Sequence, residues 1–330
     1  MNNKKVLVTG ACGFIGSHLA EYLVLKGYDV VAFDKYNRDN HHGWLENSKL
    51  KKHINIILGD IRDLDSVEKA AVGCKTIFHL AALCGIPYSY FSPLAYVKTN
   101  VVGTYNILEC AKKISCENTI ITSSSEVYGT AQYIPIDEKH PIVGQSPYAA
   151  SKIAADNLAI SYFKSFKTPI KIFRPFNTFG PRQSLRAVIP SIILQFLSNS
   201  KKIKMGNLFP TRDFTYVSDT VNGFYQFSKS NKFFGETVNF GTNSEISIKD
   251  LIKLISKNLE TGKKIQIETI RKRSKESEVN RLKCDNRKFF KILKPKKKKL
   301  ISLEEGIKMT VKFIKNNFQK YKNKEQNYNI

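Results

Sequence analysis

The chain opens with a short apolar run, Val6–Val8, which leads into glycines at positions 10, 13 and 16 and a helical pattern from Phe14 to Lys26. Strand, tight turn and helix in this order form the context of a dinucleotide fingerprint. The glycines let the backbone approach a pyrophosphate, whose charge then lies at the helix N-terminus. A second predicted strand, Asp29–Phe33, ends beside Asp34, about 20 residues on, where a carboxylate accepts ribose hydroxyls. An arginine at this position would suit the 2′-phosphate of NADP. Because the chain has an aspartate there, the segment predicts a site for NAD and not for NADP.

Tyr148 and Lys152 lie four residues apart at the start of a long predicted helix, Pro147–Phe166. Residues at this spacing share one helix face. The lysine ammonium, together with the positive nicotinamide of bound NAD, is expected to lower the pKa of the phenol from about 10. A tyrosinate stabilised in this way serves as general base to a substrate hydroxyl near neutral pH. The spacing also occurs by chance on helix surfaces, but its place within Ser146–Lys152 favours catalysis.

The 330 residues suffice for one large α/β unit with an appended lobe. The chain has no apolar stretch of about 18 residues, so we expect no membrane span. The first predicted strand begins by Val6, which leaves no room for a signal peptide. The six cysteines lack metal-ligand spacing, and a cytosolic enzyme would keep them reduced. Cys12 and Cys84 stand where a small apolar side chain suffices. We therefore expect a soluble, cytoplasmic protein without disulfides or metal.

The formal net charge of +25 is the feature that could indicate nucleic-acid binding. The excess consists mostly of lysine spread along the chain, and the densest run, Lys294–Lys299, has no interleaved aromatic residue. No nucleic-acid-binding module is recognisable. We interpret the charge as a lysine-rich solvated surface that attracts an anionic substrate, and we expect no nucleic-acid partner.

Predicted strands alternate with helical patterns up to Pro175, which favours a doubly wound parallel (Rossmann) sheet in an α/β fold. The strands are expected at Lys5–Thr9, Asp29–Phe33, Asn55–Leu58, Thr76–His79, Thr119–Thr122 and Ile170–Phe173. Beyond Pro175 the rhythm breaks, and Asp213–Val217 is expected to return to the sheet. We predict an NAD-binding domain of residues 1–178 and about 211–240. Residues of about 179–210 and 241–330 are predicted to form a smaller, interleaved α/β lobe that binds substrate, with loop Arg271–Leu282 closing over it.

Eight ordered motifs resemble the extended short-chain dehydrogenase/reductase family, in its nucleotide-sugar epimerase and dehydratase group. They are Thr9–His18, Asp60–Asp63, His79–Ala82, Asn100–Thr104, Ser123–Gly129, Tyr148–Lys152, Arg174–Asn177 and Arg212–Val217. The match covers essentially the whole chain. The resemblance implies cofactor contacts from Gly10, Gly13, Phe14, Ile15, Gly16, Asp34, Asp60, Ile61, Leu80, Ala81, Ala82, Asn100, Tyr148 and Lys152.

Within that group the chain is most similar to the 4,6-dehydratases of legionaminic acid biosynthesis, which act on nucleotide-linked N-acetylglucosamine. The closer likeness lies in Ile86–Tyr90, Gly129–Tyr133, Asn177–Pro190, Ser277–Leu282 and the segment from Asn37 to Leu45. Lys294-Pro295 stands where family members usually have a Gly-Trp-x-Pro turn. This departure concerns the structure of the lobe and not the chemistry.

Three reactions fit the catalytic residues: 4-epimerisation, C6 decarboxylation and 4,6-dehydration. The resemblance implies that all begin with hydride transfer from C4 to a tightly bound, recycled NAD while Tyr148 takes the hydroxyl proton. Ser124 would hydrogen-bond the same oxygen, and Lys152 would hold the nicotinamide ribose. A protein of this fold that only senses NAD is the non-enzymatic alternative, although sensors commonly lack the Tyr/Lys pair.

Glu126 discriminates between the reactions. A dehydratase must remove the C5 proton and expel water from C6, and a glutamate whose pKa is raised by partial burial can do both. An epimerase has no use for this carboxylate. Ser125 takes the place of the acidic residue of glucose-type dehydratases, as in mannose-type enzymes, and is a candidate relay. Decarboxylases can also carry Ser-Glu here, but they need cations for the C6 carboxylate, which the sequence does not place. A structural role of Glu126, as a cap or ion-pair partner, remains open.

The remaining candidate residues face the substrate. Arg182, Arg186 and Arg212 lie in loops that resemble the family's diphosphate clamp, which the planar guanidinium suits. Asn177 and Val188 are further candidates for contacts to the substrate. Arg273, Glu278 and Arg281 are candidates for contacts to the base or ribose. Ser277–Val279 resembles the GDP-using enzymes, but UDP and GDP both stay open. His41 and His42 lack partner ligands and are interpreted as surface or substrate-edge residues.

Two long predicted helices, Ser92–Ile114 and Pro147–Phe166, resemble the intermolecular four-helix bundle of the family and predict a homodimer. Their apolar residues exceed what one face of a sheet would bury. These residues are Leu94, Val97, Val101, Ile107, Leu108, Ile153, Leu158, Ile160 and Phe163.

Overall fold

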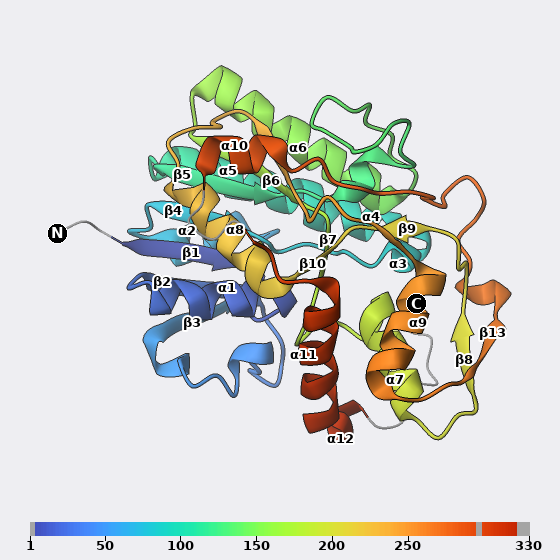
Figure 1. The fold of residues 1–330 in the computed structure, drawn as a ribbon. Helices are drawn as coiled ribbons and strands as arrows, with labels where there is room; N and C mark the ends of the chain where they lie inside the picture. The colour runs from blue at the N-terminus through green and yellow to red at the C-terminus, as the bar shows by residue number, and fades with distance from the viewer. Residues whose placement is uncertain (1–3, 295–298, 322–330) are drawn as a thin grey trace.

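The computed structural model describes residues 4–294 and 299–321. Most of the basic run expected at Lys294–Lys299, namely Pro295–Lys298, lies outside the described residues. A large sheet with helices on both faces occupies one side of the molecule, and a smaller lobe built around α7, α9 and α11 lies beside it (Figure 1).

The core of the fold is a sheet of seven parallel strands in the order β11-β6-β5-β4-β1-β2-β3. The strands are β1 (Lys5–Thr9), β2 (Asp29–Lys35), β3 (Ile54–Gly59), β4 (Thr76–His79), β5 (Asn118–Thr122), β6 (Ile170–Pro175) and β11 (Thr237–Phe240). They are short apolar runs rich in β-branched residues, as expected for strands buried on both faces. The predicted doubly wound parallel sheet is confirmed.

Helices cover the two faces of this sheet. Helices α1 (Phe14–Leu25) and α8 (Val217–Lys229) pack together on one face. Helices α2 (Leu64–Ala71), α5 (Gly103–Lys113) and α6 (Pro147–Phe166) pack on the other. Each face has its own buried apolar cluster. The strand ends left uncovered by these layers meet along one edge, where α/β sheets bind ligands.

Helix α6 begins and ends where its sequence dictates. The hydroxyl of Ser146 accepts a hydrogen bond from the backbone N–H of Ala149, and Pro147 occupies the first turn, where a missing N–H costs nothing. The helix ends at Lys167, which is in the left-handed conformation. This fixed start places the first two turns of α6 at the ligand-binding edge of the sheet.

The helix predicted for Ser92–Ile114 exists but is not a uniform α-helix. It consists of α4 (Pro93–Tyr96), a π-helical segment (Val97–Val102) and α5. Insertions of this kind widen a helix locally and occur often near functional sites. Here the π-helical segment carries Asn100, whose side chain is buried.

The smaller lobe combines helices with two-stranded sheets. Its helices are α7 (Val188–Leu197), α9 (Ile248–Leu259), α11 (Leu303–Asn316) and the short α12 (Phe318–Tyr321). Its strands are β8 (Lys202–Met205) with β13 (Lys264–Ile267), and β9 (Thr211–Arg212) with β12 (Ile246–Ser247). Helix α10 (Arg287–Leu293) packs on β11, and α3 (Ile86–Phe91) lies against α4 and α6.

The expectation that Asp213–Val217 returns to the central sheet is wrong. Strand β10 (Phe214–Tyr216) pairs with β7 (Asn177–Phe179) in a separate two-stranded sheet. The free edge of β6 is taken by β11 instead, so only the short β7 is left for β10. In the described part of the chain no helix is long and apolar enough to cross a membrane, and all six cysteines are free.

Candidate active site

A cavity of about 630 Å³ lies at the carboxyl ends of β1, β2, β4 and β5. Most of the residues predicted from the sequence line it together. They are Gly10, Gly13, Phe14, Ile15, Gly16, Asp34, Asp60, Ile61, Leu80, Ala81, Ala82, Ser124, Ser125, Glu126, Tyr148, Lys152 and Asn177. The topology of the sheet therefore brings residues from more than half the length of the chain into one site.

The turn between β1 and α1 can be made only with glycine. Gly10 has φ of 67°, and a Cβ atom on it would lie 2.8 Å from the backbone nitrogen of Ala81. A Cβ atom on Gly16 would lie 2.1 Å from the carbonyl oxygen of Gly10. The resulting close approach presents the N-terminus of α1 to the cavity. Because no side chain caps this end of the helix, its backbone N–H groups can receive a pyrophosphate.

Asp34, at the end of β2, is held in place by backbone donors. Its Oδ2 accepts from the N–H of Cys12 at 2.6 Å and its Oδ1 from the N–H of Lys35 at 2.7 Å. Burial raises the pKa of Asp34, and these hydrogen bonds oppose the rise. Asp60 is paired with Arg62, whose Nη2 lies 2.5 Å from its Oδ2. The glycine cradle and the two carboxylates fit the pyrophosphate and the adenosine part of a dinucleotide.

Tyr148 and Lys152 lie buried on one face of α6, as predicted. Ser124 hydrogen-bonds the phenol of Tyr148. The ring edge of Tyr96 packs against the Tyr148 ring, with the centroids 6.2 Å apart. Burial raises the pKa of Tyr148 well above its usual range, while the Ser124 hydrogen bond opposes this. Cys84, Glu126 and Tyr96 raise this pKa further. The lowering predicted from the sequence includes the positive nicotinamide of bound NAD, and it stays a prediction for the NAD-bound site.

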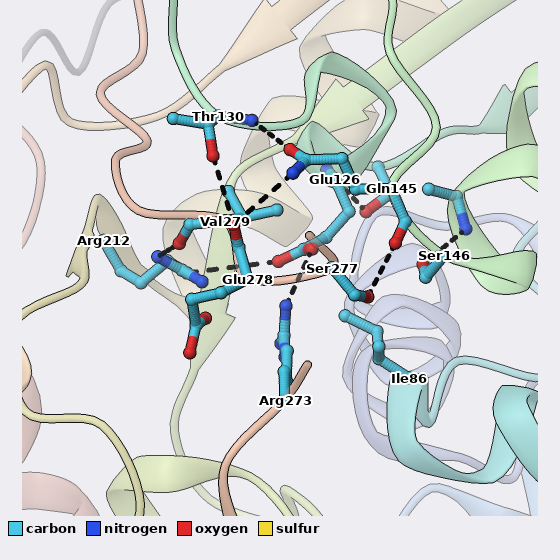
Figure 2. Close-up of polar contacts among 12 residues, drawn as sticks. Ile86, Glu126, Thr130, Gln145, Ser146, Arg212, Arg273, Ser277, Glu278 and Val279 are labelled. Atoms are coloured by element: carbon cyan, nitrogen blue, oxygen red, sulfur yellow. Dashed lines mark hydrogen bonds and ion pairs between the residues drawn. The ribbon is translucent and has the colours of Figure 1, made fainter. Parts of the chain in front are cut away.

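Glu126 follows β5 in a short 3-10 turn, Ser125–Tyr128. The Ser124 side chain accepts from the backbone N–H of Glu126 and fixes the start of this turn. The carboxylate is only 9 % exposed and points toward two guanidinium groups (Figure 2). Nη1 of Arg273 lies 3.3 Å from Oε2, and Nε of Arg212 lies 4.0 Å from Oε1. Arg212 is itself fixed by donating to the carbonyl oxygens of Thr211 and Val279.

A strap of chain, residues 273–279, crosses the site beside Glu126 (Figure 2). It is tied to the loop before α6, since the Ser277 hydroxyl donates to the carbonyl oxygen of Gln145 at 2.6 Å and the Gln145 amide donates to that of Glu276 at 2.7 Å. The Thr130 hydroxyl donates to the carbonyl oxygen of Glu278. The strap therefore holds Arg273 beside the Glu126 carboxylate.

Several predicted residues lie elsewhere. Arg182 pairs with Glu21 on α1, with Nη2 and Oε2 2.9 Å apart, and Arg281 pairs with Glu245 and is half exposed. Neither lines the cavity, because each is drawn to the nearest carboxylate. Val188 begins α7 and also lies outside the lining.

Asn100, predicted as a cofactor contact, lies behind the wall of the cavity. Its side chain is buried, and it both accepts from the backbone N–H of Leu83 and donates to the Leu83 carbonyl oxygen. It also donates to the Ser151 hydroxyl. Asn100 therefore supports the loop after β4, which lines the cavity, and does not line the cavity itself.

Three lining residues were given no role in the site from the sequence. Cys84, interpreted as a small apolar filler, lines the cavity with Tyr88 and Gln183. Arg186, a weak candidate for the diphosphate clamp, has its Nη1 near the backbone of Gly85. The only sequence feature that could have placed Cys84 at the cavity is its position after a predicted strand. No cluster of three potential metal ligands occurs in the described ranges, 4–294 and 299–321.

Comparison with known proteins identifies the class of the molecule. The sequence model of the family named GDP-mannose 4,6 dehydratase matches residues 7–310. Human dTDP-D-glucose 4,6-dehydratase is 32% identical over 338 residues, which cover 98% of this chain and 93% of the human protein. UDP-glucuronic acid decarboxylase 1 of Xenopus tropicalis is 30% identical over 98% of this chain and 75% of its own length.

A solved structure shows the same overall fold. It is the UDP-glucuronic acid 4-epimerase of Bacillus cereus in complex with UDP-glucuronic acid and NAD, with a TM-score of 0.85 and 29% sequence identity. The alignment covers 95% of this chain and 99% of the epimerase. Dehydratase, decarboxylase and epimerase relatives are thus about equally similar, so the reaction must be argued from the site.

Proposed function

The chain belongs to the nucleotide-sugar dehydratase and epimerase group of the extended short-chain dehydrogenase/reductases, and we propose that it is a 4,6-dehydratase of GDP- or UDP-N-acetylglucosamine. Its cofactor is NAD. The product is the 4-keto-6-deoxy sugar nucleotide, and we propose that it feeds the synthesis of legionaminic-type sugars. The preference for N-acetylglucosamine rests on the sequence stretches Ile86–Tyr90, Asn177–Pro190 and Ser277–Leu282.

The residues of the site divide the reaction between them. The glycine turn, Asp34 and Asp60 would hold NAD, which would supply the hydride acceptor for C4 and the hydride donor for C6. Tyr148 removes the proton of the C4 hydroxyl, which Ser124 holds by a hydrogen bond, and Lys152 orients the nicotinamide ribose. Glu126 removes the C5 proton, made acidic by the C4 ketone, and protonates the departing C6 hydroxyl, with Ser125 as a relay. When the hydride is returned to C6, C5 takes up a proton from solvent and Tyr148 releases to solvent the proton that it took from C4. The net change is the loss of one water without net oxidation.

The single observation that carries this proposal is the buried carboxylate of Glu126 in the same cavity as Ser124 and Tyr148. An epimerase needs only to oxidise and reduce C4, so a carboxylate buried there would cost desolvation energy without a function. The arginines beside it offset that cost by pairing with the carboxylate.

The same arginines favour a second candidate function. A decarboxylase needs cations to bind the C6 carboxylate of a glucuronic acid, and the sequence alone did not show which residues could supply them. Arg212 and Arg273, which lie beside Glu126, are candidates for this role. This arrangement supports decarboxylation of a nucleotide-linked glucuronic acid as the runner-up.

The test is to incubate the purified protein separately with UDP-N-acetylglucosamine, GDP-N-acetylglucosamine and UDP-glucuronic acid in deuterated water, with mass spectrometry of the products. We expect an N-acetylglucosamine nucleotide to lose one water and to gain one solvent deuterium at C5. A product of unchanged mass with C4 inverted would identify an epimerase, and loss of carbon dioxide from UDP-glucuronic acid would identify a decarboxylase.

A further inference from the structure

Arg174, near the end of β6, and Asp156, on α6, form an ion pair in the interior of the protein. Nη2 of Arg174 lies 2.7 Å from Oδ2 of Asp156, and the two side chains are 2% and 5% exposed. Neither residue takes part in a step of the proposed reaction. A buried pair of this kind is weak evidence for stability, because desolvation of both charges offsets their attraction.

The guanidinium of Arg174 connects the pair to the catalytic segment. Its Nε donates to the Ser123 hydroxyl at 3.1 Å, and its Nη1 donates to the Tyr128 hydroxyl at 2.6 Å. The Ser123 hydroxyl in turn donates to Oδ2 of Asp156 at 2.5 Å. Ser123 and Tyr128 stand directly on either side of the residues 124–127. The segment that carries Ser124 and Glu126 is therefore held at both of its ends.

Asp156 connects the same pair to the other catalytic element. It lies one turn beyond Lys152 and two turns beyond Tyr148 on α6, so it shares their face of the helix. Its negative charge raises the pKa of Lys152, against the lowering caused by burial. Cys84 and His79 are other titratable groups near Lys152, and Cys84, Glu126 and Tyr96 are those near Tyr148.

We propose that Asp156 and Arg174 are positioning residues, whose pair fixes the Ser124–Glu126 segment against the face of α6 that carries Tyr148 and Lys152. Ser124 and Glu126 come from the end of β5, whereas Tyr148 and Lys152 come from α6, so the reaction depends on how the two elements are spaced. Apolar packing would tolerate small shifts between them, but charge-assisted hydrogen bonds from a planar guanidinium do not.

The pair is also not built for stability alone. Oδ1 of Asp156 is buried and makes no hydrogen bond with the described residues, and an unsatisfied oxygen of this kind costs folding energy. An apolar pair of similar volume would avoid that cost. What the ionic pair adds is a defined geometry between two catalytic elements.

The experiment compares Asp156→Asn and Asp156→Glu with the parent enzyme, and this part rests on the proposed function. Asp156→Asn keeps the shape and loses the charge. We expect kcat per NAD-loaded site to fall about 10- to 100-fold, as for a misplacement of about 1 Å, with KM changed less than about twofold. Asp156→Glu restores the charge and should recover part of the loss. The matched control is Lys171→Met, which removes another buried charge from β6 and should leave kcat per folded site unchanged.

A second readout needs no substrate. Backbone amides of Ser123–Tyr128 should exchange with deuterated water faster in Asp156→Asn than in the parent, with the rest of the sheet unaffected. Parent-like kcat and parent-like exchange would overturn the inference, as would uniformly faster exchange with parent-like kcat per folded site. If the parent turns over no sugar nucleotide, the proposed function fails and the exchange result alone decides this inference.

Should Asp156→Asn not fold, the double variant Asp156→Leu/Arg174→Met removes both charges and leaves neither one unpaired. We expect it to fold, to bind NAD, to turn over slowly and to show faster exchange at Ser123–Tyr128. Turnover and exchange equal to those of the parent would exclude a positioning role.

Discussion

The carboxylate of Glu126 illustrates how single residues are tuned in this protein. A buried carboxylate is costly unless charged or polar groups compensate it, and here Arg212 and Arg273 do so from two separate segments. Guanidinium groups also bind diphosphates well. An anionic substrate group would therefore compete with Glu126 for the same two arginines.

Two substitutions separate the steps of the proposed reaction. Tyr148→Phe removes the base for C4 oxidation, so no NADH should form on addition of substrate. Glu126→Gln leaves oxidation intact and removes the base at C5, so a small NADH absorbance should appear. Dehydration should then slow by about 10²- to 10⁴-fold, the range typical of lost acid–base catalysis. Dehydration by Glu126→Gln at the parent rate, measured by mass spectrometry, would show that Glu126 is structural.

Lys171 gives a prediction on stability against pH. It is fully buried, donates to the carbonyl oxygens of Phe227 and Ser230, and burial lowers its pKa from 10.5 to about 8. Between these values the unfolded chain binds more protons than the folded one, so stability rises with pH through this window. The free energy of unfolding of Lys171→Met minus that of the parent, both measured with urea, should therefore decrease between about pH 8 and about pH 10. Parallel curves for the two proteins would contradict this.

At the scale of elements, the sequence predicts what local patterns determine. Strands β1 and β4 and helix α6 have the predicted bounds, because each combines an apolar pattern with clear end signals. The pairs β8·β13 and β9·β12 were not predicted, because such short strands form only through a partner distant in sequence. The π-helical segment at Val97–Val102 has no local signal either.

The same contrast holds for the site. Gly10, Asp34, Tyr148 and Glu126 could be found because their roles impose residue types at fixed places along a strand or helix. The contact of Arg273 with Glu126 depends instead on how the strap folds back, which spacing along the chain does not reveal.

The turn between β1 and α1 supports a test at this scale. Gly16→Ala would place a Cβ atom against the Gly10 carbonyl oxygen, so the turn must open and the N-terminus of α1 must move. We expect this variant to be purified with little or no NAD, as judged by absorbance at about 260 nm, and to melt at lower temperature. The control is Gly262→Ala, whose Cβ atom meets nothing within 4 Å. Equal NAD content in both variants would refute the role of this turn.

At the scale of the whole molecule, we propose a homodimer formed by α4, the π-helical segment, α5 and α6. Not all the residues predicted for this interface are available to it, since Ile107 and Leu108 are buried in the core under the sheet. Exposed apolar side chains nevertheless remain on these elements. They are Leu94, Val97, Val102, Tyr105 and Phe166.

Light scattering should therefore report a dimer at micromolar concentration. The double variant Val97→Glu/Val102→Glu should shift the protein to monomer, because two carboxylates per subunit would be buried at the interface without partners. Leu25→Glu, at an exposed position at the end of α1, should stay dimeric. A monomeric parent protein would rule out this interface.

The order of the elements along the chain has a consequence for engineering. The chain leaves the sheet after β6, builds α7 and β8, returns for α8 and β11, and leaves again for α9 and α11. The smaller lobe is thus built from two separate segments of the chain and not one. Exchanging sugar preference with a relative would require both segments to be transplanted together, with three splice points that match. Truncation after β6 would strip α8 from α1 and leave β6 with a bare edge, which invites aggregation.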